Sequence, residues 1–164
     1  NPTFDAVGPP DGYWGAKLVM SFTDDQLTAV TEATRWSDFS ARAYLLDGLK
    51  ERRDRIGRHW FARVSPLDGP RVEGGAIAFD DLWTRHFGGT AQYRYDFDGG
   101  GAAADGIADQ ARVPIPAGLT ADAGGRARVR VWRSRAEGTG WAPRPATIWL
   151  EPDGGGWRVT GVRY

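Results

Sequence analysis

Several residue types that carry chemistry in other proteins are rare or missing in this sequence. The 164 residues include no cysteine, two histidines and one methionine. The absence of thiols excludes disulfides, zinc–thiolate sites, iron–sulfur clusters and cysteine nucleophiles. No apolar run approaches the roughly 20 residues needed to cross a bilayer, so the sequence predicts no transmembrane segment of its own.

Neither sign of charge is in excess. The 21 basic residues balance 21 acidic ones, which argues against a protein that binds nucleic acid through bulk positive charge. Nineteen of the basic residues are arginine, whose planar guanidinium makes bidentate and stacking contacts that lysine cannot make. No glycine-rich phosphate-binding motif stands between a strand and a helix, so no cofactor is predicted.

The chain begins without an initiator methionine or a recognisable secretory signal. We therefore expect a processed product, an excised domain or one chain of a larger assembly. Residues 1–10 contain several prolines and show no periodicity, which predicts an extended arm.

Residues 11–64 have helical periodicity and predict a unit of about three helices. Thr23 and Gln26 match a capping box, which is expected to begin a helix over roughly 24–34. Ser37-Asp38 is expected to cap a longer helix, in which apolar side chains recur on one face at Leu45, Leu49, Ile56 and Trp60. The pair Ser65-Pro66 is expected to end this helix.

From residue 65 the hydrophobic period changes to two. Alternation is clearest at residues 91–97, 126–131, 146–150 and 157–160, and weaker at 76–79 and 111–115. The glycine-rich stretch 99–104 predicts a mobile loop. We therefore predict an α+β chain in which residues 65–164 form an antiparallel β-sandwich of immunoglobulin or fibronectin type.

Several segments resemble the C-terminal region of large, uncharacterised exported bacterial proteins. They are Tyr13–Asp24, Tyr44–Asp47, Glu51–Arg58, Phe79–Leu82, Arg85–His86 and Trp157–Val162. The resemblance implies that this chain is the tail of a longer protein, and that any catalytic part of such proteins lies upstream. It implies no particular activity.

The outer face of the predicted sheet is a candidate binding surface. The alternating Val, Ile and Leu of the strands near 130 and 148 are expected to face the core. That alternation turns a second set of side chains outward: Arg128, Arg130, Trp132 and Trp149. Tryptophan together with arginine is the composition of interface hot spots. Two interpretations are open, because either a partner or sugar ring binds this face or the helical unit docks on it.

A second candidate surface lies on the longest predicted helix. Residues 50–63 carry six basic side chains against two acidic ones. Arg52, Arg55 and Arg58 are predicted to contact an acidic protein face or phospholipid headgroups. The alternative is a solvated face, in which arginines pair with acidic residues one turn earlier, as in Glu51–Arg55 and Asp54–Arg58.

One acidic motif is a weak candidate for a metal. Asp96-Phe97-Asp98 has the ligand spacing that opens a calcium-binding loop. Gly100 and Ile107 occupy two later positions where such a loop needs oxygen ligands. The sequence therefore predicts no metal site.

These observations predict a non-catalytic interaction or scaffolding protein outside the cytoplasm. It is expected to be an extrinsic subunit or accessory domain that contacts other protein subunits of a larger assembly at a membrane, such as a respiratory or photosynthetic complex. One alternative is a carbohydrate-binding module of an exported enzyme, whose outward tryptophans stack on sugar rings. Another is a small hydrolase that uses Asp80, Asp81 and His86 for acid–base chemistry.

Overall fold

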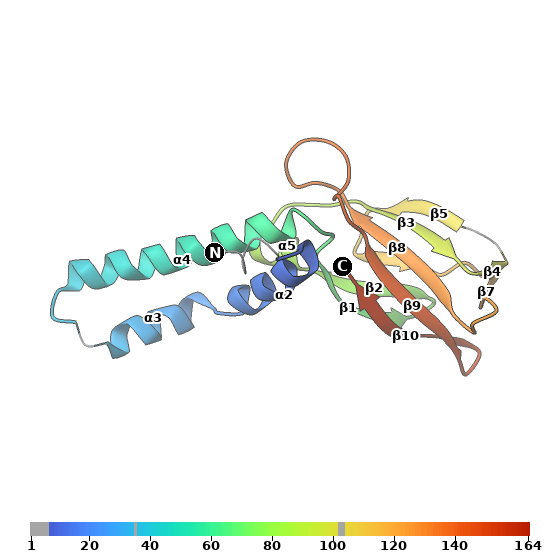
Figure 1. The fold of residues 1–164 in the computed structure, drawn as a ribbon, viewed down its shortest axis with the longest axis horizontal. Helices are drawn as coiled ribbons and strands as arrows, with labels where there is room; N and C mark the ends of the chain where they lie inside the picture. The colour runs from blue at the N-terminus through green and yellow to red at the C-terminus, as the bar shows by residue number, and fades with distance from the viewer. Residues whose placement is uncertain (1–6, 35, 102–103) are drawn as a thin grey trace. The chain divides into compact units, whose positions relative to one another are not determined.

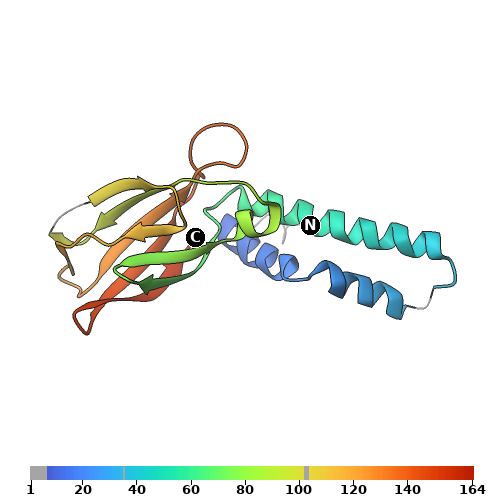
Figure 2. The same cartoon turned by 180° about the vertical axis from the view of Figure 1, so that it is seen from behind.

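The computed structural model describes residues 7–34, 36–101 and 104–164. The chain divides into two compact units, residues 1–61 and 62–164, which are considered separately below. Within the described residues, the first unit is helical and the second is built mainly from antiparallel strands (Figures 1 and 2). This confirms the predicted α+β class, whereas the immunoglobulin or fibronectin type stays a prediction.

The first helix, α2 (Pro9–Met20), begins inside the segment predicted as an arm. Two prolines fit its first positions because the amides of the first turn have no intrahelical acceptor. The amide of Gly8 donates to the carboxylate of Asp11 at 3.3 Å, which helps to set this start. The prediction of an extended arm is therefore wrong at residues 9–10, and residues 1–6 of that arm lie outside the described residues.

The capping signals of the next two helices are confirmed. In α3 (Asp24–Ala33), the amide of Gln26 donates to Thr23 Oγ1 at 3.2 Å, and Gln26 Oε1 accepts from the amide of Thr23 at 3.0 Å. At the start of α4 (Phe39–Phe61), Asp38 Oδ1 accepts from two main-chain amides, at 2.8 and 3.1 Å. Helix α4 ends at Phe61, so the predicted end at Ser65-Pro66 is wrong by about one turn.

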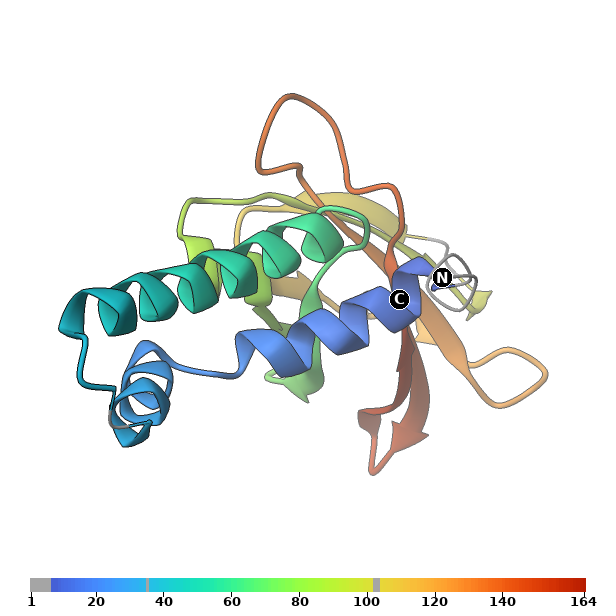
Figure 3. The same ribbon diagram turned by 60° about the vertical axis from the view of Figure 1, so that its left-hand side comes forward.

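Helices α2 and α4 run side by side, as Figure 3 shows. Their contact includes the rings of Tyr13 and Phe61, whose centroids lie 5.8 Å apart. Asp24 holds α3 to α4, because it pairs with Lys50 Nζ at 3.1 Å and Arg53 Nη1 at 2.8 Å. Part of the predicted basic face is therefore used inside the helical unit.

The second unit contains three antiparallel sheets within its described residues. One sheet has the strand order β1-β2-β6, another β10-β9-β8-β3-β5, and the smallest pairs β4 with β7. The strands are β1 (Leu67–Glu73), β2 (Ala76–Asp81), β3 (Tyr93–Asp98), β4 (Gly100–Gly101), β5 (Ala104–Ala108), β6 (Arg112–Pro114), β7 (Leu119–Thr120), β8 (Ala127–Arg133), β9 (Ala146–Asp153) and β10 (Gly156–Arg163). The predicted loop 99–104 thus contains strand β4, and its residues 102–103 lie outside the described part.

The core of this unit follows the predicted alternation in β8 and β9. Val129, Val131, Ile148 and Leu150 are completely buried. The residues between them are only half-buried, so these two strands have one core face and one outer face. Alternation had therefore identified both faces correctly.

A short helix, α5 (Leu82–Phe87), follows β2 and was not predicted. Asp81 is its N-terminal cap, because Asp81 Oδ1 accepts from the amide of Thr84 at 3.1 Å. Among the helices of the described residues, none is both long and apolar enough to cross a membrane.

Candidate functional site

The outer face of the five-stranded sheet carries a ladder of charged and aromatic side chains. Arg128 lies opposite Asp98 of β3 on one side and Trp149 of β9 on the other. Arg130 lies opposite Asp96 in the same way. These carboxylates bind the arginines: Arg128 pairs with Asp98, and Arg130 makes a bidentate pair with Asp96 at 2.8 and 2.9 Å.

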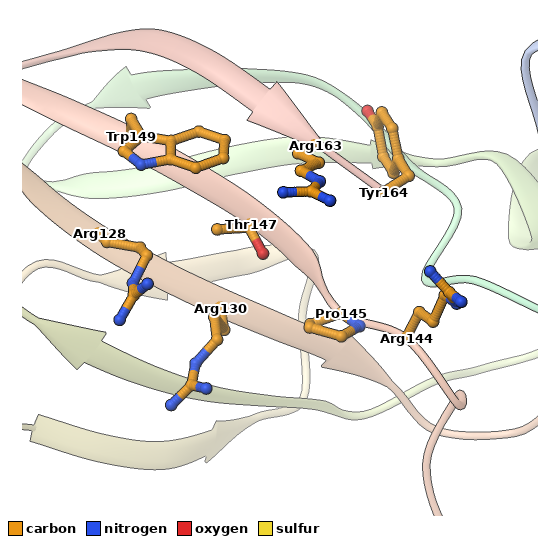
Figure 4. A pocket seen from close by; sticks show the side chains of 8 residues that line it. All are labelled: Arg128, Arg130, Arg144, Pro145, Thr147, Trp149, Arg163 and Tyr164. Atoms are coloured by element: carbon orange, nitrogen blue, oxygen red, sulfur yellow. The ribbon is translucent and has the colours of Figure 1, made fainter. Parts of the chain in front are cut away.

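A shallow hollow of about 260 Å³ opens on this face (Figure 4). Strands β8, β9 and β10 all contribute to it, together with the residues just before β9. Three of the residues predicted to bind a partner therefore come together here: Arg128, Arg130 and Trp149. The other lining residues were not singled out from the sequence: Arg144, Pro145, Thr147, Arg163 and Tyr164.

Arg163 reaches this face because of an irregularity in β10. The register with β9 shifts between Val159 and Gly161, so that Gly161 lies opposite Trp149 and Arg163 opposite Thr147. Strict alternation from Val159 would place residue 163 on the core side, and one extra residue reverses that assignment. The irregularity also brings a glycine next to the indole, since a β-carbon at Gly161 would contact the Trp149 ring at 3.7 Å.

Hydrogen bonds of two buried residues anchor the chain on both sides of the hollow. The carbonyl of Arg144 accepts from the amide and the hydroxyl of Ser65, each at 2.9 Å. At the C-terminus, the Tyr164 hydroxyl donates to the carbonyl of Leu67 at 2.7 Å. Ser65 and Tyr164 are both buried, so Arg144 and Arg163 project from a well-anchored backbone.

Basic side chains outnumber acidic ones in the lining of the hollow. Four arginines line it, and no acidic residue does. Asp98 and Asp96 neutralise Arg128 and Arg130. In the described part of the chain, no carboxylate pairs with Arg144 or Arg163, and both residues are exposed.

The second predicted tryptophan, Trp132, lies in a separate cluster on the same face. The guanidinium of Arg94, its cross-strand neighbour on β3, lies 4.4 Å from the Trp132 ring centroid. The Arg130 guanidinium is 5.5 Å from the same ring, and Arg94 is also 5.5 Å from the ring of Trp141. Cation–π contacts of this kind stabilise the indole and occupy its face.

The three arginines singled out on α4 are exposed and remain outside this face. Arg55 makes the predicted ion pair with Glu51. Asp54, predicted to pair with Arg58, accepts from Arg53 at 2.8 Å. Arg52, Arg55 and Arg58 are absent from the lining of the hollow beside Trp149.

Two of the three candidate acid–base residues, Asp80 and Asp81, line the same hollow. Asp81 is buried and binds Arg133 Nε at 2.6 Å and the Tyr93 hydroxyl at 2.8 Å. Asp80 is paired with Arg85 at 2.7 Å, and this hydrogen bond holds the pKa of Asp80 below its usual value. A hollow of about 470 Å³ is lined by Asp80 and Asp81 but not by His86, which lies exposed on α5. Asp80 and Asp81 are thus engaged in ion pairs with arginines, and the hydrolase alternative gains no support from this hollow.

Tyr93 should make the protein sensitive to alkali. Burial, and then the negative charge of Asp81, raise the pKa of Tyr93 above its usual value. The tyrosine of the unfolded chain ionises at pH ~10, whereas Tyr93 in the folded protein stays protonated at that pH. Ionisation stabilises the unfolded state, so the contribution of Tyr93 to folding stability is complete below pH ~10 and is lost as the pH rises further. We expect the stability advantage of the wild type over Tyr93→Phe, measured by urea unfolding, to be constant from pH 7 to 9 and to shrink above ~10. An advantage unchanged up to pH ~11 would contradict this.

The calcium-like motif is also explained by the sheet. Asp96 and Asp98 lie on strand β3, and both carboxylates are bound by arginines of β8. Among residues 7–34, 36–101 and 104–164, no group of three or more histidine, aspartate or glutamate side chains could hold a metal ion.

Comparison with known proteins adds no relative. No protein-family model matches the sequence, and no curated protein or solved structure gave a significant match.

Proposed function

We propose that this chain is a non-catalytic interaction or scaffolding domain that binds another protein through the outer face of its five-stranded sheet. The observation that carries the proposal is the position of Trp132 and Trp149, both half-buried on a face that also presents arginines. Tryptophan and arginine dominate the binding energy of protein interfaces, because they combine large contact areas with directional polar groups.

The proposed scaffold is a sandwich of immunoglobulin or fibronectin type, which the three-stranded and five-stranded antiparallel sheets support. The proposed setting is a larger assembly outside the cytoplasm, at a membrane surface, with this chain as an extrinsic subunit or accessory domain. Its support is the resemblance to exported bacterial proteins described above.

A carbohydrate-binding module is less well supported by the geometry. Ring stacking requires an open aromatic face. The Arg94 guanidinium, 4.4 Å from the centroid, already lies over the ring of Trp132. Only Trp149 of the two predicted tryptophans then remains for a sugar, and four arginines border the hollow beside it.

The proposal is tested by isolating the tagged full chain from its native cells, with and without a mild detergent. We expect the wild type to be recovered in a large complex with other polypeptides. Trp132→Ala and Trp149→Ala should each weaken that association by about 30-fold, the effect of losing a hot-spot tryptophan.

Tyr44→Ala is the matched control, because Tyr44 is 83% exposed but lies on helix α4. It should leave the complex intact. Recovery of the wild type only as a monomer would overturn the proposal, and so would loss of the complex on Tyr44→Ala but not on the tryptophan substitutions. Binding of the wild type to a glycan array through Trp149 would favour the carbohydrate-binding alternative instead.

A further inference from the structure

We infer that the hollow beside Trp149 is a binding subsite for paired carboxylates on an acidic segment of the partner protein. This inference rests on the proposed function and specifies the chemistry of the partner. The inference depends on one juxtaposition: the half-buried Trp149 lies in the same hollow as Arg144 and Arg163. Neither arginine has a carboxylate partner among the described residues.

The first step concerns charge. The whole chain has a formal net charge of zero, so a local positive excess must result from separation of charge in the fold. Two of the four arginine charges in the hollow are neutralised by Asp96 and Asp98. The remaining two correspond to a ligand with about two negative charges.

The second step concerns desolvation. In water, the exposed guanidinium groups of Arg144 and Arg163 are well hydrated and carry no penalty. A partner that covers the Trp149 ring also removes water from the rest of the hollow. Burying a charge without a counter-charge is strongly unfavourable, so a partner that binds here has to bring acidic groups with it.

The third step concerns size and geometry. A hollow of about 260 Å³ is below the usual range of ~300–1,000 Å³ for pockets that enclose a small molecule. It accommodates side chains presented by another protein. Guanidinium groups bind carboxylates through two parallel N–H···O bonds, and Arg130 already binds Asp96 in this way on the same face.

The fourth step concerns preorganisation. Hydrogen bonds of Ser65 and Tyr164, which are both buried residues, anchor the chain at Arg144 and beside Arg163. A ligand therefore has to order only the two arginine side chains, which lowers the entropic cost of binding.

The test uses the full-length chain and two fluorescent peptides, one of alternating glutamate and glycine and one of alternating glutamine and glycine. We expect the glutamate peptide alone to bind, with an affinity that falls as salt is raised. Arg144→Gln and Arg163→Gln should each weaken binding about tenfold, the loss of one charge-assisted bidentate contact. Arg158→Gln is the matched control, because Arg158 is exposed on β10 but already pairs with Glu151 at 2.6 Å.

Equal binding of the two peptides would overturn the inference, as would an equal loss with Arg158→Gln. Preferential binding to phosphatidylserine vesicles through Arg144 and Arg163 would assign the hollow to a lipid surface and would also overturn it.

The two proposals fail in different ways. If the tryptophan substitutions abolish the native complex but Arg144→Gln/Arg163→Gln does not, the interaction face stands and the carboxylate subsite is wrong. If the wild-type chain binds the glutamate peptide through both arginines but forms no complex in cells, the subsite stands and the proposed function is wrong.

Discussion

Replacing Asp81 with asparagine should lower the free energy of unfolding by about 3–5 kcal/mol, because it leaves the charge of Arg133 buried without a counter-ion. Both side chains of this pair are only 4% exposed. Arg133 enters the interior from the core face of β8, where the preceding inward residues are valine and alanine. Asp81 Oδ2 also accepts from Thr84 Oγ1 and the Tyr93 hydroxyl, both at 2.8 Å, so one oxygen serves three donors.

The adjacent residue provides the control for Asp81→Asn. Asp80 pairs with Arg85 and Arg71 at the surface, where ion pairs contribute about 0–1 kcal/mol, so Asp80→Asn should have little effect on stability. Urea unfolding measures both changes, and hydrogen exchange should show the loss of protection in residues 67–133 for Asp81→Asn. The double substitution Asp81→Leu/Arg133→Met should recover much of the loss, because apolar residues often replace a buried pair at little cost. A loss below about 1 kcal/mol for Asp81→Asn would contradict a buried charge pair.

Replacing Gly12 with alanine should destabilise the helical unit by about 1–3 kcal/mol, although alanine is the better helix former. Gly12 is buried on α2, and a β-carbon built there overlaps the six-membered ring of Trp60 on α4. The indole is rigid, so either the Trp60 side chain leaves its position or the two helices separate. The steric cost therefore exceeds the gain of about 0.5–1 kcal/mol in helix propensity.

Gly15 is the matched control because it lies three residues later on the same helix. It is exposed, and a β-carbon there has no atom within 4 Å. Gly15→Ala should therefore stabilise the helix by about 0.5–1 kcal/mol. Circular dichroism at 222 nm and hydrogen exchange in residues 9–61 measure both substitutions. If the two substitutions shift stability in the same direction, the close contact between Gly12 and Trp60 is refuted.

The elements that were predicted well are those whose geometry depends only on residues close to one another in the sequence. The capping box of Thr23 and Gln26 uses residues three apart, so its geometry depends on the local chain alone. The outward positions of Arg128 and Trp149 follow from the period-two geometry of a strand, once the inward residues are recognised as apolar. Both inferences need no knowledge of distant segments.

The elements that were missed depend on distant segments. Strand β1 contains Gly69 and Pro70, which argue against a strand, and both fall at a register shift in its pairing with β2. Strand β5 has low strand propensity and exists because it pairs with β3, where Gly106 lies opposite Tyr95 and leaves room for its ring. Helix α5 (Leu82–Phe87) is capped by Asp81, a residue that the acid–base hypothesis assigns to chemistry.

The residues of the candidate site also fall into these two groups: some are specified by the local sequence, and others depend on distant segments. The sequence by itself determined that Arg128, Arg130 and Trp149 point away from the core, because alternation is a local property of the backbone. The pairing of β8 with β9 then brings them onto one face. The tertiary structure decided that Arg163 joins them, through the register shift near Thr160, and that Arg144 lies beside them, through the bond of its carbonyl to Ser65. The tertiary structure also decided that the Arg133 side chain is buried. A buried arginine needs a counter-charge, and here Asp81, which is distant in the sequence, supplies it.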